Sequence, residues 1–455
     1  MSVVLLFLLI IGLLVLGVPI AIALGLSSVL YLLILSETTL AAVAQAMYQS
    51  MAGHYTLLAI PFFILASIFM TTGGVSQRII RFSIALVGHL PGGLAIAGVV
   101  ACMMFSALSG SSPATVVAIG TIVIAGMRKT GYSVDFASGV ICTAGTLGIL
   151  IPPSIVMVVY ASATDVSVGR MFLGGILPGL LAGGMLMVTI YAIAVHRNLP
   201  RGEWQGWREV LLSARDAAWG LILIVIVLGG IYGGLFTPTE AAAIAAVYAC
   251  IIALFVYRDI GPLAATDGAG FPLKASAVIT AWFHRDTLDG LARAARLSVT
   301  LMFIVANALI LKHVLTDQQV PQHIANTMVQ AGMGPVIFLI TVNIILLVGG
   351  QFMEPSGLIV IVAPLVFPIA IELGIDPIHL GIIMIVNMEI GMITPPVGLN
   401  LFVTSGVSGL PAMQVVKASL PFLAILLLFL IIVTYIPWIS TALPTAIMGP
   451  EIVLR

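Results

Sequence analysis

Two groups of small, oxygen-bearing residues stand beside consecutive prolines, and their types suit the binding of a monovalent cation. One proline pair lies within Gly148 to Ser154 and the other within Gly391 to Val397. Two consecutive prolines remove two backbone donors and free carbonyl oxygens one turn earlier in a helix. Such carbonyls are hard ligands for an ion like sodium, and the uncharged hydroxyls nearby add further oxygen atoms. The sequence therefore predicts two sodium sites.

A turn rich in glycine or serine precedes each proline pair and supplies the remaining ligands. The expected sodium ligands are Ser106, Ser109, Gly148, Ile151 and Pro153 in the first half, and Gly350, Gly391, Thr394 and Val397 in the second. An anionic substrate would lie between the two turns, where helix N-termini direct N–H groups inward. Its expected contacts are Ser111, Ser112, Thr115, Ser356 and Asn400. Single glycines and serines more often serve close helix packing in lipid, but the repeated arrangement beside a Pro-Pro break favours binding sites.

Ionisable residues within the apolar stretches are few, and each invites a functional interpretation. They are Glu240, Glu354 and Glu389. Glu354 precedes a proline in its turn, so we favour a capping role over direct ion binding. Glu389 lies just before Gly391, where it either tunes the second ion site or pairs with another residue. Glu240 follows a Thr-Pro turn, an ordinary helix start, so a structural role is favoured.

The composition shows what kind of element must position these residues. Hydrophobic residues make up 61% of the 455-residue chain and charged residues 7%, and the mean hydropathy is +1.23. A soluble domain carries about 25% charged residues, whereas apolar runs of about 17–25 residues can cross a membrane as helices. The net charge is zero, with no basic run that would favour nucleic-acid binding. The sequence predicts an all-α polytopic membrane protein.

The chain repeats one order of segments, and its charges indicate that the two copies are inverted. The expected divisions are a first repeat 1–195 with hairpin 91–127 and broken helix 134–163, a cytoplasmic linker 196–216, a second repeat 217–438 with hairpin 335–372 and broken helix 377–409, and an external C-terminal tail 439–455. Arginines in the linker and around the first hairpin place both in the cytoplasm, whereas acidic residues flank the second hairpin. Both hairpins should be re-entrant, since their charged flanks cannot cross cheaply. Inverted repeats with broken helices are typical of secondary transporters.

With these motifs, the chain resembles the large membrane subunit of tripartite ATP-independent periplasmic (TRAP) transporters, the family of the dicarboxylate and sialic acid systems. The most specific parts are Phe105 to Ser112, Gly148 to Ser154, Thr237 to Ala241 and Gly391 to Gly398. The resemblance implies sodium-driven uptake of a small organic anion across the bacterial inner membrane by an elevator motion. It also implies a secreted periplasmic binding protein and a small four-helix membrane subunit, here expected as a separate chain. No enzymatic activity and no cofactor besides the coupling sodium ion are implied.

One motif departs from the family pattern, and other classes of protein stay open. The second turn reads Phe352 to Pro355, where the family would have aspartate before the proline, so the substrate class is open. A stand-alone sodium-coupled symporter or antiporter would share the inverted hairpins but need no binding protein. An intramembrane hydrolase would need a nucleophile beside a base, and the Ser109 to Ser112 run has neither a Gly-x-Ser-x-Gly pattern nor a histidine in the membrane nearby.

Overall fold

The computed structural model describes residues 2–35, 40–53, 55–72, 74–258, 260–263, 278–330, 332 and 334–450. All regular secondary structure in these residues is helical. Seven of the described helices are long and apolar enough to cross a membrane, or eight if one bent pair counts as a single span. The predicted all-α polytopic class is confirmed.

The first half of the chain forms a series of helices interrupted at proline and glycine. They are α1 (Ser2–Val15), α2 (Ile20–Leu35), α3 (Leu40–Gly53), η1 (Tyr55–Leu58), α4 (Ala59–Thr72), α5 (Val75–Val87), α6 (Gly93–Ser109), α7 (Ser112–Lys129), α8 (Val134–Ala144), η2 (Leu147–Leu150), α9 (Ile155–Thr164) and α10 (Val168–His196). Helices α6 and α7 occupy the range expected for the first hairpin. Their connection turns at Gly110, whose φ of 60° suits a residue without a Cβ.

The second half repeats this order. Its helices are α11 (Trp207–Tyr232), α12 (Pro238–Ile251), the π-helical turn η3 (Ile252–Tyr257), η5 (Ala281–Phe283), α14 (Arg285–Asp317), α15 (Val320–Gln330), α16 (Pro335–Gly349), α17 (Pro355–Glu372), α18 (Pro377–Gly391), α19 (Leu399–Ser408), α20 (Ala412–Tyr435) and α21 (Trp438–Met448). Helices α16 and α17 occupy the expected second hairpin. Helix α21 covers most of the segment expected as a C-terminal tail, and Arg170 holds its end by donating to the carbonyl oxygens of Met448 and Gly449.

The two broken helices run antiparallel to each other. The Gln414 side chain, in the first turn of α20 and a few residues past the end of α19, donates to Asp135 at the start of α8 over 2.8 Å. At the opposite end, the Tyr160 hydroxyl of α9 donates to the carbonyl oxygen of Pro377, the first residue of α18, over 2.7 Å. The start of each broken helix therefore lies near the end of the other.

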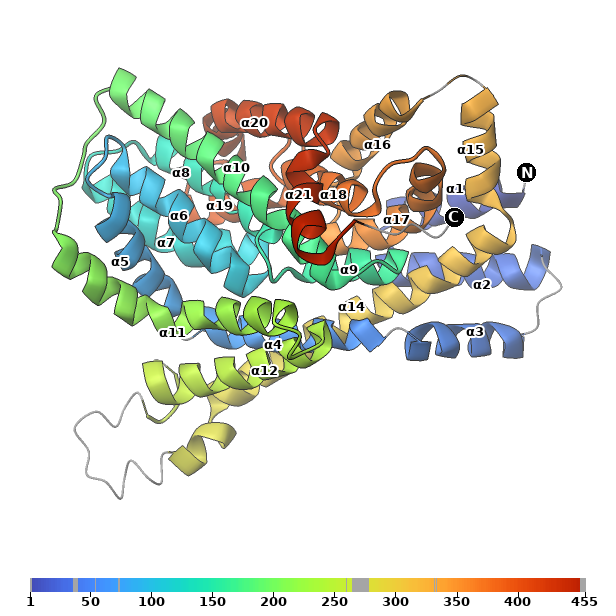
Figure 1. Ribbon diagram of the computed structural model, residues 1–455, viewed down its shortest axis with the longest axis horizontal. Helices are drawn as coiled ribbons and strands as arrows, with labels where there is room; N and C mark the ends of the chain where they lie inside the picture. Colours follow the sequence, from blue (N-terminus) through green and yellow to red (C-terminus); the bar gives the residue numbers. More distant parts are fainter. Residues whose placement is uncertain are drawn as a thin grey trace.

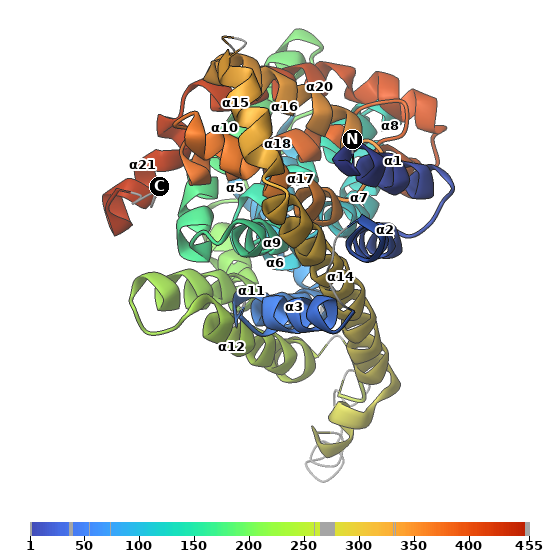
Figure 2. The ribbon, with the colours of Figure 1, turned by 90° about the vertical axis from the view of Figure 1, so that its right-hand side faces the viewer.

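The helices fall into two packed groups (Figures 1 and 2). Along one side of the molecule, α12 packs on α4, α4 on α14, and α14 on α2, and we call these four helices the outer group. The hairpin group comprises α6–α10 and α16–α20, which pack against one another as hairpins, broken helices and closing helices. The hairpin tips lie where the two groups meet.

The linker between the halves packs on the open end of the first hairpin. Arg81 of α5 forms ion pairs with Glu209 and Asp216 of α11, at 2.7 and 2.9 Å. The Tyr132 hydroxyl, just after α7, donates to the carbonyl oxygen of Pro200 over 2.5 Å. The linker and the open end of this hairpin thus lie on the same side of the molecule.

Candidate ion and substrate sites

Behind the tip of the first hairpin, three hydroxyl groups converge. Ser106 and Ser109, on the last turn of α6, lie with their Oγ atoms 2.8 and 3.0 Å from Oγ1 of Thr115 on α7. All three side chains are buried. The cluster is neutral and rich in oxygen, so it offers ligands to a cation without requiring a counter-charge.

The first break packs directly against this cluster. A Cβ added to Gly148 would lie 1.4 Å from Cβ of Ser106, so only glycine allows the break to approach α6 this closely. The Gly148 carbonyl oxygen accepts from the amide of Ile151 over 3.2 Å and keeps a second lone pair. The structure therefore brings together Ser106, Ser109 and Gly148, with Ile151 and Pro153 following in the same short segment.

The second break repeats the geometry with glycine on both sides. A Cβ added to Gly391 would lie 2.8 Å from the Cα and carbonyl carbon of Gly350 at the second tip. The Gly391 carbonyl oxygen accepts from the amide of Thr394 over 3.0 Å, as Gly148 does from Ile151. The Thr394 hydroxyl donates to the carbonyl oxygen of Ile390 over 2.7 Å, which leaves its own lone pairs free. Val397 lies half-buried after the proline pair.

A cavity of about 380 Å³ lies between the two hairpin tips and the outer group. Ser109, Gly110 and Ser111 line it from the first tip, and Glu354, Ser356 and Gly357 line it from the second. Most of the remaining wall is apolar, and is formed by Ile20, Ile64, Ser67, Ile68, Ile155, Val156, Leu297, Thr300, Leu301 and Ile304. A cavity that is mostly apolar with a few polar groups is typical of a site for a small molecule.

The expected substrate contacts divide into two sets. Ser111 and Ser356 line the cavity, whereas Ser112, Thr115 and Asn400 do not and are almost fully buried behind the tips. Asn400 Nδ2 donates to Ser112 Oγ over 2.6 Å, and Ser112 Oγ donates to the carbonyl oxygen of Gly145 over 3.1 Å. These groups join the first hairpin to the second broken helix.

Among the cavity residues that were not expected contacts, Ser67 and Glu354 form hydrogen bonds at the tips. Ser67 of α4 lines the cavity and donates to the carbonyl oxygen of Ser109 over 2.5 Å. Its sequence context is an ordinary apolar span, so no local signal distinguishes it. Glu354 stands at the N-cap position of α17, where its side chain makes no capping hydrogen bond. Instead it lines the cavity and accepts from the Ser356 hydroxyl over 2.5 Å.

Glu240 has the structural role that its position favours. The Thr237 side chain accepts from the Glu240 amide, and the Glu240 carboxylate accepts from the Thr237 amide over 2.8 Å. This capping box satisfies donors at the start of α12 that have no intrahelical partner.

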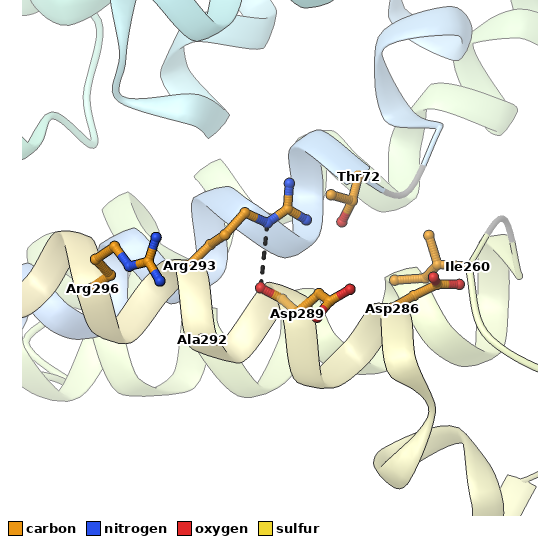
Figure 3. A pocket seen from close by; sticks show the side chains of 7 residues that line it. All are labelled: Thr72, Ile260, Asp286, Asp289, Ala292, Arg293 and Arg296. Carbon is orange, nitrogen blue, oxygen red and sulfur yellow. Dashed lines mark hydrogen bonds between the residues drawn. The ribbon is translucent and has the colours of Figure 1, made fainter.

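A second cavity, of about 690 Å³, lies at the N-terminal half of α14 (Figure 3). Asp286, Asp289, Arg293 and Arg296 supply its charges, with Thr72, Ile260 and Ala292 completing the lining. Asp286 accepts from the amide of Gly261, and Asp289 lies 3.8 Å from Arg285. This second cavity carries charges of both signs, and its arginines are exposed. The smaller cavity between the tips is therefore the better candidate for an organic substrate.

Comparison with known proteins agrees with this geometry. The family described as "Tripartite ATP-independent periplasmic transporter, DctM component" matches residues 7–439. The C4-dicarboxylate TRAP transporter large permease protein DctM of Vibrio cholerae serotype O1 is 68% identical over 455 residues, covering 100% of both chains. The protein of the same name from Pseudomonas aeruginosa is 57% identical and covers 93% of both.

A solved structure supports the fold alone. The Alcanivorax borkumensis YdaH transporter, described as having an unusual topology, superposes with a TM-score of 0.59 at 16% sequence identity. The match covers 90% of this chain and 91% of that one. From the family match, the near full-length relatives and the apolar helices, the chain belongs to the DctM component family of tripartite ATP-independent periplasmic transporters and is a multi-pass protein of the bacterial inner membrane.

Proposed function

We propose that this chain is the large permease subunit of a sodium-coupled TRAP transporter that takes up a C4-dicarboxylate by an elevator motion. The observation that carries the proposal is the cavity of about 380 Å³ between the two tips, with an oxygen cluster directly behind the first. The substrate class rests on the relatives named as C4-dicarboxylate permeases, which align over nearly the whole chain.

Sodium coupling is supported by the position of the oxygen atoms relative to the cavity. Ser109 contributes its hydroxyl to the cluster and also lines the cavity. An ion bound by Ser106, Ser109 and the carbonyls of the first break would therefore order the tip that contacts the substrate. The second set, at Gly350, Gly391, Thr394 and Val397, would order the second tip in the same way. Ion binding would thus prepare the cavity for the substrate.

The elevator motion is supported by the contrast between contacts within and between the two groups. Within the hairpin group, tips and breaks approach each other so closely at Gly148 and Gly391 that a Cβ on either glycine would clash with the opposite tip. Polar contacts between this group and the outer group, among the described residues, include Ser67 to Ser109 and Lys312 Nζ to Asp165 at 2.7 Å. Next to α4, Thr56 Oγ1 of η1 lies 3.2 Å from Ser162 Oγ of α9. Tips and breaks would move together as one body against the outer group.

The proposed partners are a secreted periplasmic binding protein and a small four-helix membrane subunit encoded as a separate chain. The binding protein would capture the dicarboxylate, and the small subunit would widen the fixed outer group. We propose a transport role without catalysis, since the polar groups of the cavity are hydroxyls and one carboxylate without a basic partner among the described residues.

The test is uptake of labelled succinate into proteoliposomes. Uptake should require this chain, the small subunit, the cognate binding protein and an inward sodium gradient together, and omission of any one should abolish it. Replacing sodium by choline at equal ionic strength is the control for the gradient. Strong sodium-driven uptake by this chain alone would instead identify a stand-alone symporter. Uptake that ignores sodium would contradict the coupling.

A further inference from the structure

Two cavities follow one another along a single face of α14. The cavity between the hairpin tips, here called the tip cavity, is lined from α14 by Leu297, Thr300, Leu301 and Ile304, and the second cavity by Asp286, Asp289, Ala292, Arg293 and Arg296. These positions recur at spacings of three and four residues, which places them on one side of the helix. On α4, Ile68 lines the tip cavity and Thr72, one turn later, lines the second cavity (Figure 3). The two cavities are therefore neighbours between α4 and α14, which pack against each other.

The charges on this face of α14 stand in a fixed order. Arg296 and Arg293 lie nearer to the tip cavity, and Asp289 and Asp286 lie beyond them. The aspartates have other partners, since Asp289 lies 3.8 Å from Arg285 and Asp286 accepts from a backbone amide. Arg293 Nε donates to the carbonyl oxygen of Asp289 over 3.4 Å, and in the described part of the chain neither Arg293 nor Arg296 forms an ion pair with a carboxylate. Both guanidinium charges are therefore available to attract an anion.

The two arginines are close enough to act on an anion in the tip cavity. A helix rises about 1.5 Å per residue, so Arg296 begins about 6 Å from Thr300, and Arg293 begins about 6 Å from Leu297. Exposed charges act over a screening length of about 8–10 Å at physiological ionic strength. Leu297 lines the tip cavity and is 52% exposed, so the wall of the tip cavity is open at the end nearest the arginines. Their positive potential therefore extends into the tip cavity.

We propose that this face of α14 is the path by which the dicarboxylate leaves the tip cavity for the cytoplasm, and that Arg293 and Arg296 attract the anion along it. The start of α14 belongs on the cytoplasmic side because arginines gather there, Arg258 and Arg285 among them. Fixed positive charges in a cleft raise the local concentration of an anion and speed its passage. The aspartates beyond the arginines would repel the anion and so limit its retention. This inference rests on the proposed uptake of a dicarboxylate and adds its route of release.

The path can be tested without transport by the reaction of a single cysteine with charged reagents. Thr300→Cys is introduced into a cysteine-free variant in inside-out membrane vesicles, so that the cytoplasmic side faces the medium. Its rates of reaction with an anionic and with a cationic methanethiosulfonate are measured, and their ratio reports the local potential. Adding Arg293→Gln and Arg296→Gln should lower the ratio of anionic to cationic rate by about tenfold. At a salt concentration of about 1 M, where screening acts within about 3 Å, most of this difference should disappear.

Two arginines of α11 provide the matched control. Arg208 and Arg215 are exposed and line neither cavity, so Arg208→Gln with Arg215→Gln changes the net charge equally and should leave the rate ratio unchanged. If the variant that lacks both α14 arginines does not fold, Arg296→Gln alone should lower the ratio about threefold. Arg296→Lys keeps the positive charge and should hold the ratio at the starting value.

The outcomes separate this path from the proposed function. A rate ratio that does not change on removal of the α14 arginines, or that changes as much in the α11 control, would overturn their role. Reaction of Thr300→Cys only from the periplasmic side would overturn the direction of the path. Each of these results leaves sodium-dependent succinate uptake by the wild-type complex untouched. Absence of that uptake would instead refute the proposed function, whatever the cysteine reaction shows.

Discussion

Replacement of Gly148 by alanine tests whether the first break and the first hairpin share an ion site. The added Cβ would lie 1.4 Å from Cβ and 2.0 Å from Oγ of Ser106. Carbon atoms in contact stay about 3.5–4.0 Å apart, so the hairpin must withdraw by about 2 Å. Overpacking of this kind costs about 1–3 kcal/mol or more. The hairpin would then no longer pack as it does in the wild type.

The loss of ion affinity should exceed the loss of stability. Metal–ligand distances tolerate changes of about 0.2 Å, far less than the expected withdrawal of the Ser106 and Ser109 hydroxyls. We expect the sodium concentration for half-maximal uptake to rise by about a hundredfold, equivalent to about 2.7 kcal/mol. Succinate uptake in proteoliposomes at graded sodium concentrations measures this, and the Tm of the purified chain reports the overpacking.

A matched glycine serves as the control. Apart from its chain neighbours and the nearby backbone of α10 itself, no heavy atom of the described residues lies within 4 Å of a Cβ added to Gly184. Alanine is favoured over glycine within a helix by about 0.5–1 kcal/mol, so Gly184→Ala should keep its sodium dependence and hold or raise its Tm. If Gly148→Ala matches Gly184→Ala in both measurements, the close approach of break and hairpin has no role in ion binding.

Three further predictions address the second ion site, the membrane topology and the contact between the helix groups. Thr394→Val removes a hydroxyl whose lone pairs are free, and Ser109→Ala removes a hydroxyl of the oxygen cluster at the first site. Each should raise the sodium concentration that uptake requires about ten- to a hundredfold, from about 1.5–3 kcal/mol per bond to a charged group. Unchanged sodium curves in both variants would show that these side chains are not ligands. Cysteines introduced at Gln205 and Gln330 of a cysteine-free variant should react with an impermeant thiol reagent from opposite sides of the membrane, and labelling from one side would contradict the inverted repeat. Lys312→Met breaks the ion pair with Asp165, which is partly exposed and therefore worth at most about 1 kcal/mol. The uptake rate should change less than about fivefold, and the sodium requirement should stay the same. A larger change would show that the pair does more than hold α14 to the end of α9.

Local features of the sequence were sufficient to predict the helical segments. The expected hairpin 335–372 runs from the first residue of α16 to the last of α17, and the expected broken helix 377–409 differs by one residue from the end of α19. Proline and glycine mark these boundaries because their backbone restrictions act within a few residues. Candidate ion ligands could be proposed from the sequence because a Pro-Pro pair also acts locally, by altering the hydrogen bonding of its own helix.

The walls of the cavity could not be predicted in this way. Ser67, Leu297 and Thr300 reach the cavity from α4 and from the part of α14 that follows Arg296, and both stretches are largely apolar. In a membrane helix both lipid and protein neighbours favour apolar residues, so periodicity does not show which face meets the hairpin tips. The burial of Ser112 and Asn400 behind the tips likewise depends on a contact between distant segments.

The contact of Gly148 with Ser106 bears on how the ion specificity of such a protein can evolve. Much of each proposed site consists of backbone carbonyls, which every residue type possesses, so substitution of the residues that bear them leaves the ligand atoms in place. The separation of two main-chain segments then determines which ion fits the site. Glycine fixes that separation, because any side chain would force the two segments apart. A lineage that came to use a larger or smaller cation would have to reshape the packing around its glycines before changing any ligand.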